Sequence, residues 1–280
     1  MDDRNLRAYM AELIGTFALV FVSAGATIAA RMMQGGQVPV LFSVGLAVAL
    51  IYAAVLAVTM PISGGYLNPA FTLMLWVFKR LDGARAFALI LVQMLGGVIG
   101  GLALRYLLPA KDDLLSVTCL GTPHLSPIYF DVSSATLTPI LKGIGLELVL
   151  TFVVAFVLCG LVFDPRVPRG ATRLSALWLG LALGAMTMVG LPLTGAAMNP
   201  ARWFGPAMAE MTVAFLRDSH PFADHALFWI GPIAGALAAG WLYTALVLPS
   251  EEEQQTGMHV PATAGSATAG GSSTYIRAKK

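Results

Sequence analysis

Long runs of apolar residues, separated by short polar segments, dominate the chain. A helix needs about 20 apolar residues to cross the hydrocarbon core of a bilayer. Six runs reach that length, at about 8–30, 38–60, 84–108, 139–163, 173–192 and 224–248. The polar, proline-containing stretch 109–138 predicts a long loop, and the Ser/Thr/Gly/Ala-rich end 249–280 predicts a disordered cytoplasmic tail. The pattern therefore predicts one membrane domain over residues 1–248.

Two shorter apolar pieces, 68–78 and 199–216, break this pattern because each begins with Asn-Pro-Ala. Asn is a preferred N-cap, and Pro fits the first helical turn, where its missing N–H would be unpaired anyway. A piece of about 10 residues rises about 15 Å, half of the hydrocarbon thickness of about 30 Å. We expect two re-entrant loops, each leading into a half-helix at its triplet: Asn68, Pro69, Ala70 and Asn199, Pro200, Ala201.

The chain also repeats itself. AELIGTF in the first span matches LELVLTF in the fourth, and their glutamates, Glu12 and Glu147, lie 135 positions apart. The two triplets lie 131 positions apart. Each half, about 6–108 and 139–248, holds three spans, and an odd number forces the second half to insert upside down. The predicted fold is an all-α membrane protein with six transmembrane helices, two re-entrant half-helices and an inverted repeat.

Composition and charge agree with a membrane location. The chain is 57% hydrophobic and 11% charged, against about 25% charged in soluble domains. A net charge of +2 gives no reason to expect a nucleic-acid partner. The short loops on one side carry eight basic residues, so we expect both termini in the cytoplasm: Arg4, Arg7, Lys79, Arg80, Arg85, Arg166, Arg169 and Arg173. With no targeting signal evident, we expect a bacterial inner (plasma) membrane.

Catalytic and metal-binding motifs are missing from the sequence. It contains no HExxH or GxSxG and no clustered His or Cys. Cys119 and Cys159 form no CxxC pattern; Cys159 reads as a small core residue, and a disulfide between the two stays open. We therefore predict a protein that is not an enzyme, with no cofactor, catalytic residue or metal site.

The two half-helices suggest what the membrane domain does. Their positive dipole ends would meet near the midplane, where each Asn side chain can also donate a hydrogen bond. Such a centre favours oxygen lone pairs and repels cations, which suits a passive channel for neutral solutes. Glu12 and Glu147 leave an alternative open, because buried carboxylates in spans are often functional. Either they bind protons in a proton-coupled secondary transporter, or they accept hydrogen bonds from the backbone of the loops.

SGGYLNPAFT and TGAAMNPARWFGPA resemble the two signature loops of the major intrinsic protein family, the aquaporins and aquaglyceroporins, and the resemblance covers about residues 6–248. It implies that Asn68 and Asn199 donate to the permeating molecule and that Arg202 belongs to a selectivity filter. It favours the loop-supporting role for Glu12 and Glu147. It also implies a homotetramer in the lipid bilayer with one pore per subunit, for water and small neutral solutes.

The resemblance places the other filter positions by counting from the triplets. They are Ala196, Thr187 and, without gaps, Val48; alignment on the Gly-Leu pair at 45–46 gives Val44 instead. Such a filter is wider and less polar than the aromatic and histidine filter typical of water-selective members. We expect it to pass water and to be wide enough for glycerol, ammonia, hydrogen peroxide, urea or undissociated metalloid acids.

Other positions point toward the water-type branch or stay open. Trp203 after Arg202, where the glycerol branch usually has Asp, and the pair Phe228-Trp229 are typical of the water type. Spacing on the half-helix turns Trp203 away from Arg202, toward packing. Tyr66 stands at the cytoplasmic approach, where the family commonly has His. It either narrows that approach or packs against its own loop.

Overall fold

A computed structural model describes residues 3–33, 37–108, 118–131, 137–167, 172–214 and 222–249 of the chain. Arg169, most of the predicted tail 249–280 and much of the predicted loop 109–138 lie outside these residues. Throughout the described ranges the regular structure is helical.

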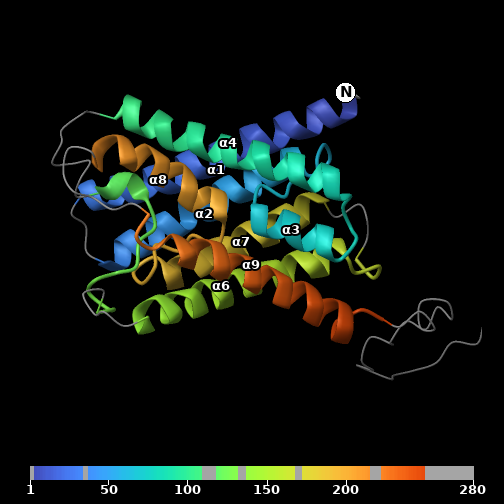
Figure 1. The fold of residues 1–280 in the computed structure, drawn as a ribbon. Coiled ribbons are helices and arrows are strands. Elements are labelled where there is room, and N and C mark those ends of the chain that lie inside the picture. The colour runs from blue at the N-terminus through green and yellow to red at the C-terminus, as the bar shows by residue number, and fades with distance from the viewer. Residues whose placement is uncertain are drawn as a thin grey trace, which may run out of the picture. The chain divides into compact units, whose positions relative to one another are not determined.

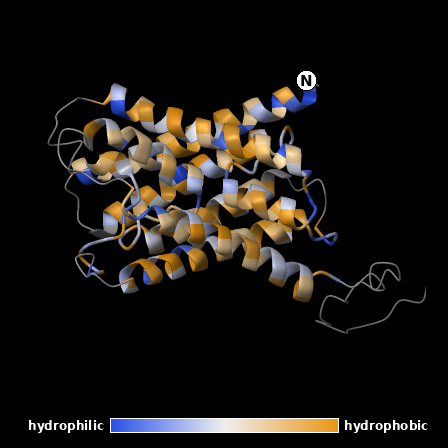
Figure 2. Ribbon diagram, viewed as in Figure 1, coloured by the Kyte–Doolittle hydropathy of each residue, from blue (hydrophilic) through white to orange (hydrophobic). Residues whose placement is uncertain are grey.

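Six long helices correspond to the six predicted apolar runs (Figures 1 and 2). They are α1 (Asp3–Met32), α2 (Gln37–Thr59), α4 (Gly83–Leu107), α6 (Thr138–Val162), α7 (Thr172–Gly190) and α9 (His225–Leu242), which continues as the π-helical turn η2 (Tyr243–Val247). In the described residues, five are long and apolar enough to cross a membrane, and the apolar part of α7, Leu174–Gly190, is shorter. The predicted all-α membrane architecture is confirmed.

The half-helices are α3 (Pro69–Val77) and α8 (Pro200–Ala214), and they lie toward opposite ends of the bundle (Figure 1). Each has a proline as its first residue, as the triplets predicted. At α3 the capping Asn68 has extended backbone angles, φ −150° and ψ 117°, so the chain arrives as a loop and turns into the helix at the triplet.

Helix contacts repeat between the two halves. α1 packs along α4 as α6 packs along α9, and α4 meets α8 as α9 meets α3. α2 and α7 pack against each other and join the halves at the centre. The main helix contacts of one half therefore have counterparts in the other, which is what the sequence repeat predicted.

Small residues let these helices approach to backbone contact. A Cβ on Gly97 of α4 would lie 2.6 Å from the carbonyl oxygen of Ala201 in α8. A Cβ on Gly184 of α7 would lie 2.6 Å from the carbonyl oxygen of Gly45 in α2. No side chain fits at such distances, so these glycines are required for packing inside one chain.

On the face that carries the N-terminus, the segment after α6 is tied to the end of α9. Asp164 accepts hydrogen bonds from Arg166 at 2.6 and 2.8 Å and from the Tyr243 hydroxyl at 2.7 Å. Arg166 also donates to the carbonyl of Val247 at 3.1 Å. The bonds from Arg166 hold the pKa of Asp164 well below its usual range, although burial opposes them.

Candidate functional site

Glu12 of α1 holds the first re-entrant loop through its carboxylate. The Ser63 hydroxyl and the backbone N–H of Tyr66 donate to one oxygen at 2.6 and 2.9 Å. The backbone N–H of Leu67 and the Gln93 amide donate to the other oxygen, both at 2.7 Å. The side chain is fully buried, so these four donors replace the water that a carboxylate would otherwise need.

Glu147 of α6 holds the second loop in the same way. It accepts from the Thr194 hydroxyl at 2.6 Å and from the backbone N–H groups of Ala197 and Met198 at 3.0 and 2.7 Å. Each of these donors lies 131 positions after a donor to Glu12, the same offset as between the triplets. The two carboxylates are therefore equivalent anchors in the two halves.

Both anchored loops contain strained backbone. Leu67 and Met198, the residues before the two asparagines, have φ of 51° and 50°. Left-handed angles cost a residue with a side chain about 1–3 kcal/mol and persist only where the surroundings enforce them. The N–H groups of these same two residues donate to Glu12 and Glu147, so the carboxylates stabilise the turns that aim the asparagines.

Asn68 and Asn199 each cap their own half-helix. The Asn68 side-chain oxygen accepts from the backbone N–H of Ala70, and that of Asn199 from Ala201, both at 2.9 Å. This fixes the orientation of both amides, because the oxygen is held by the helix start and the NH₂ group must point away from it.

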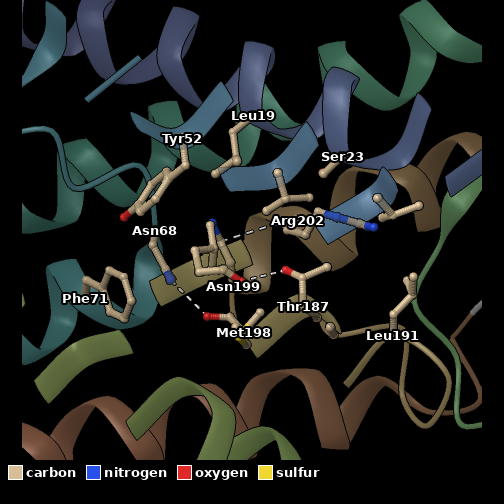
Figure 3. Close-up of a pocket in the computed structure, with 15 residues that line it drawn as sticks. Leu19, Ser23, Tyr52, Asn68, Phe71, Thr187, Leu191, Met198, Asn199 and Arg202 are labelled. Atoms are coloured by element: carbon tan, nitrogen blue, oxygen red, sulfur yellow. Dashed lines mark hydrogen bonds between the residues drawn. The ribbon is translucent and has the colours of Figure 1, made fainter. Parts of the chain in front are cut away.

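The same two amides also link the loops to each other. Asn68 donates to the carbonyl of Met198 at 2.9 Å (Figure 3), and Asn199 donates to the carbonyl of Leu67 at 2.8 Å. An amide NH₂ group has two N–H donors. One is used in the cross-link, and one stays available to a molecule between the loops.

A small cavity of about 20 Å³ lies where these groups meet (Figure 3). The structure brings both predicted asparagines and the four predicted filter residues to its wall: Asn68, Asn199, Val48, Thr187, Ala196 and Arg202. Val44, the alternative to Val48, lines it as well. Glu12, Glu147 and Tyr66 are not among the described residues that line it.

Sequence reasoning missed several lining residues, among them Ser23, Tyr52 and Phe71. Tyr52 follows Val48 by four positions, so it occupies the same face of α2 one turn further on. That spacing is the signal that could have found Tyr52. Ser23 on α1 had no such signal, because nothing in the pattern of α1 shows which face meets the loops.

Arg202 is 6% exposed and directs its guanidinium along the cavity wall. Its Nη1 donates to the carbonyl of Gly121 at 3.0 Å. Gly121 ends the short 3₁₀ helix η1 (Cys119–Gly121) and has a φ of 71°. Part of the predicted long loop thus folds back over the cavity and holds Arg202 in place. The Thr187 hydroxyl, also in the cavity wall, donates to the carbonyl of Leu183 at 2.8 Å, so the Thr187 oxygen can still accept a hydrogen bond.

Residues 118–131 close over the face opposite the N-terminus. The backbone N–H of Leu125 donates to Asp224 at 2.9 Å, and His124 Nε2 lies 3.1 Å from a Glu210 oxygen. Burial disfavours the charged form of His124, but ion-pair contacts with Asp224 and Glu210 outweigh it and raise the pKa of His124 to about 9. A wider cavity of about 650 Å³ opens beneath this segment and, like the central cavity, is lined by Leu191.

The sequence predicted that Trp203 packs away from Arg202, and it left the role of Tyr66 open. The structure shows how both side chains pack. Trp203 is fully buried and stacks on Phe228 of α9, with ring centres 5.6 Å apart. The ring of Tyr66 folds back over Gly64, where a Cβ would collide with it.

Comparisons with known proteins agree with this geometry. The profile described as Major intrinsic protein matches residues 2–243. Aquaporin TIP4-4 of Zea mays is 35% identical over 250 residues, which cover 88% of this chain and 89% of the relative. Probable aquaporin AqpM of Archaeoglobus fulgidus is 31% identical over 261 residues, covering 86% and 96%.

The X-ray structure of the aquaglyceroporin from Plasmodium falciparum superposes with a TM-score of 0.68, covers 87% of this chain and 97% of its own, and is 22% identical. At that identity the likeness shows the fold. Together with the profile and the relatives, it confirms the resemblance found in the sequence. The chain therefore belongs to the major intrinsic protein family and is an aquaporin-type passive channel for water and small solutes, not an enzyme.

Proposed function

We propose that water is the main permeant and that it passes the centre of each chain one molecule at a time. The observation that carries this proposal is the small cavity between Asn68 and Asn199. A cavity needs about 10–15 Å³ to hold one water molecule, and this cavity has about 20 Å³. Glycerol is far larger and would require the lining to move apart. The size of the cavity therefore supports water, the smallest of the solutes that the filter residues predicted.

The polar groups around the cavity suit a neutral molecule with oxygen lone pairs. Asn68 and Asn199 each have one N–H donor left after the cross-links. The Thr187 oxygen offers an acceptor, and Arg202 a fixed positive charge. Positive helix ends and a cationic side chain disfavour cations, hydronium included. We infer that protons and ions are excluded while water is oriented and passed.

The contact between α2 and α7 supports Val44, not Val48, as the filter residue of α2. Gly45 and Gly184 face each other, and a Cβ on either would lie 3.0 Å or less from the other's carbonyl oxygen. The two helices run antiparallel. Residue numbers therefore fall along α2 in the direction in which they rise along α7. Thr187 comes three residues after Gly184, so it lies level with the part of α2 just before Gly45. Val44 is closer to that level than Val48. Val48 then lines the next level of the cavity, toward Tyr52.

Glu12 and Glu147 serve as scaffolds in this proposal. Their oxygens already accept from loop donors, and neither carboxylate is among the described residues lining the central cavity. This arrangement supports a channel over the alternative, a proton-coupled transporter that would have to load and unload these carboxylates. In proteoliposomes with an imposed pH gradient we expect no solute accumulation; gradient-driven accumulation would establish the transporter instead.

Stopped-flow shrinkage of proteoliposomes tests the permeant. We expect fast water flow through the wild type and glycerol or urea flow close to that of protein-free vesicles. The variant Tyr52→Ala enlarges the cavity and should raise glycerol flow while water flow continues. Wild-type protein that conducts glycerol readily would refute the single-water proposal and would support the prediction of a wide filter.

The remaining assignments concern the membrane. Seven of the eight basic residues counted in the sequence belong to described segments on the face that carries the N-terminus, so we propose that this face is cytoplasmic. A reporter fused to the N-terminus should report the cytoplasm. Family membership supports a homotetramer, which light scattering of the purified protein tests. The bacterial inner-membrane location stays a prediction from the sequence.

A further inference from the structure

Three metal-ligating side chains meet in the wider cavity on the face opposite the N-terminus. The ligand atoms of Cys119, His124 and Glu210 all lie within 4.8 Å of one another. They come from η1, from the segment after it and from α8, so no sequence motif joins them. The sequence therefore predicted no metal site, and only the fold brings the three groups together.

His124 is oriented as a metal ligand would be. Its Nε2 faces Glu210 at 3.1 Å, and its Nδ1 lies 3.8 Å from a carboxylate oxygen of Asp224. Asp224 is itself fixed, because it accepts from the backbone N–H of Leu125 at 2.9 Å. Histidines that bind metals typically pair their second ring nitrogen with a carboxylate, which fixes the ring and raises its basicity.

The site is enclosed on one side and open on the other. The Glu210 side chain is 7% exposed and the His124 side chain 26%. All three ligands line the cavity of about 650 Å³. Three protein ligands with space beside them leave a fourth tetrahedral position to water. Sulfur and imidazole ligands suit zinc and neighbouring metals, whereas calcium and magnesium take oxygen ligands.

The charges around the cluster match a doubly charged ion. Cys119 as a thiolate, Glu210 and Asp224 supply three negative charges. Arg31 also lines the cavity and supplies one positive charge, so a divalent cation would make the group neutral. Coordination requires a thiolate and a neutral imidazole, so loading releases the thiol and imidazole protons to solvent.

We propose that Cys119, His124 and Glu210 bind a zinc-class divalent cation at the mouth of the channel, with Asp224 orienting the imidazole. This inference concerns a second site and does not depend on which solute the channel conducts.

Binding measurements on the full-length, tag-free protein test the proposal. With zinc chloride in isothermal titration calorimetry, we expect one ion per chain. With cobalt chloride, we expect a thiolate-to-metal charge-transfer absorption. Cys119→Ser should abolish the absorption, and Asp224→Asn, which keeps an acceptor for Leu125, should weaken zinc binding by about 10–100-fold.

Two controls separate this site from other ligands in the chain. Cys159→Ala removes the buried cysteine of α6, and His225→Asn removes an exposed histidine at the start of α9. Both should bind zinc as the wild type does. Zinc affinity unchanged by Cys119→Ser, or a cobalt complex without the charge-transfer absorption, would overturn the proposal. Thermal melts of each metal-free variant show whether it is folded.

Discussion

Replacing Glu147 with Gln separates the scaffold role of the buried carboxylates from a proton-carrying role. The side chains have the same shape, but glutamine has one acceptor oxygen where glutamate has two. An amide oxygen placed toward Thr194 and Ala197 can still accept from both. Its NH₂ group would then face the backbone N–H of Met198, which donates to Glu147 at 2.7 Å. Two donors would oppose each other at the residue whose φ is 50°.

The structure sets the magnitude of this change. A buried donor left without a partner costs about 1–3 kcal/mol. In a chain of this size each kcal/mol corresponds to about 2–4 °C in melting temperature, so Glu147→Gln should lower it by about 2–12 °C. Glu147→Ala strands all three donors and should cost about 3–9 kcal/mol. That is comparable to the whole stability of a typical protein, about 5–15 kcal/mol.

Thermal unfolding of the detergent-purified variants measures the first effect, and water permeability in proteoliposomes measures its consequence for the channel. Asp82→Asn is the matched control, because Asp82 caps α4 from an exposed position and asparagine caps equally well. A Glu147→Gln protein that melts with the wild type would refute the scaffold role. Loss of proton-coupled transport at unchanged stability would support the transporter.

Three other changes probe the packing, the filter and the face that carries the N-terminus. Trp203→Ala should cost about 3–5 kcal/mol in thermal or chemical unfolding, because the ring is fully buried against Phe228. Gly121→Ala strains a φ of 71° and brings a Cβ to 2.8 Å from the Cα of Ala24. It should loosen the anchor of Arg202 and raise the glycerol-to-water permeability ratio in stopped-flow measurements. The lowered pKa of Asp164 means that its ion pair stabilises fully above pH of about 5 and weakens below about 4. The difference in melting temperature between wild type and Asp164→Asn should therefore be constant from neutral pH to about 5 and shrink in more acid solution.

Most of the fold could be predicted from the sequence, because the relevant signals are local or repeat along the chain. Apolar runs long enough to span, and proline directly after a capping asparagine, are readable from short segments. The offsets of 131 and 135 positions revealed the two halves. The expected filter positions came only from the family resemblance, because no local pattern contains them.

The mouth opposite the N-terminus could not be predicted in this way. Gly121, His124 and Glu210 acquire their roles only when a long connecting segment folds over the bundle, and that segment has no periodicity to show where it lies. The level of Val44 relative to Thr187 depends on how two helices slide along each other. A count along one chain cannot fix that position.

The reciprocal bonds of Asn68 and Asn199 have a consequence for how the protein is made. Residue 68 leaves the ribosome 131 positions before residue 199, so the first loop enters the membrane without the Met198 carbonyl that will receive its amide. Until the second half inserts, Asn68 lacks that partner and the carbonyl of Leu67 lacks its donor. Neither half can complete the centre alone. A chain truncated between the halves should therefore be degraded by cellular quality control instead of forming an incomplete, leaky pore.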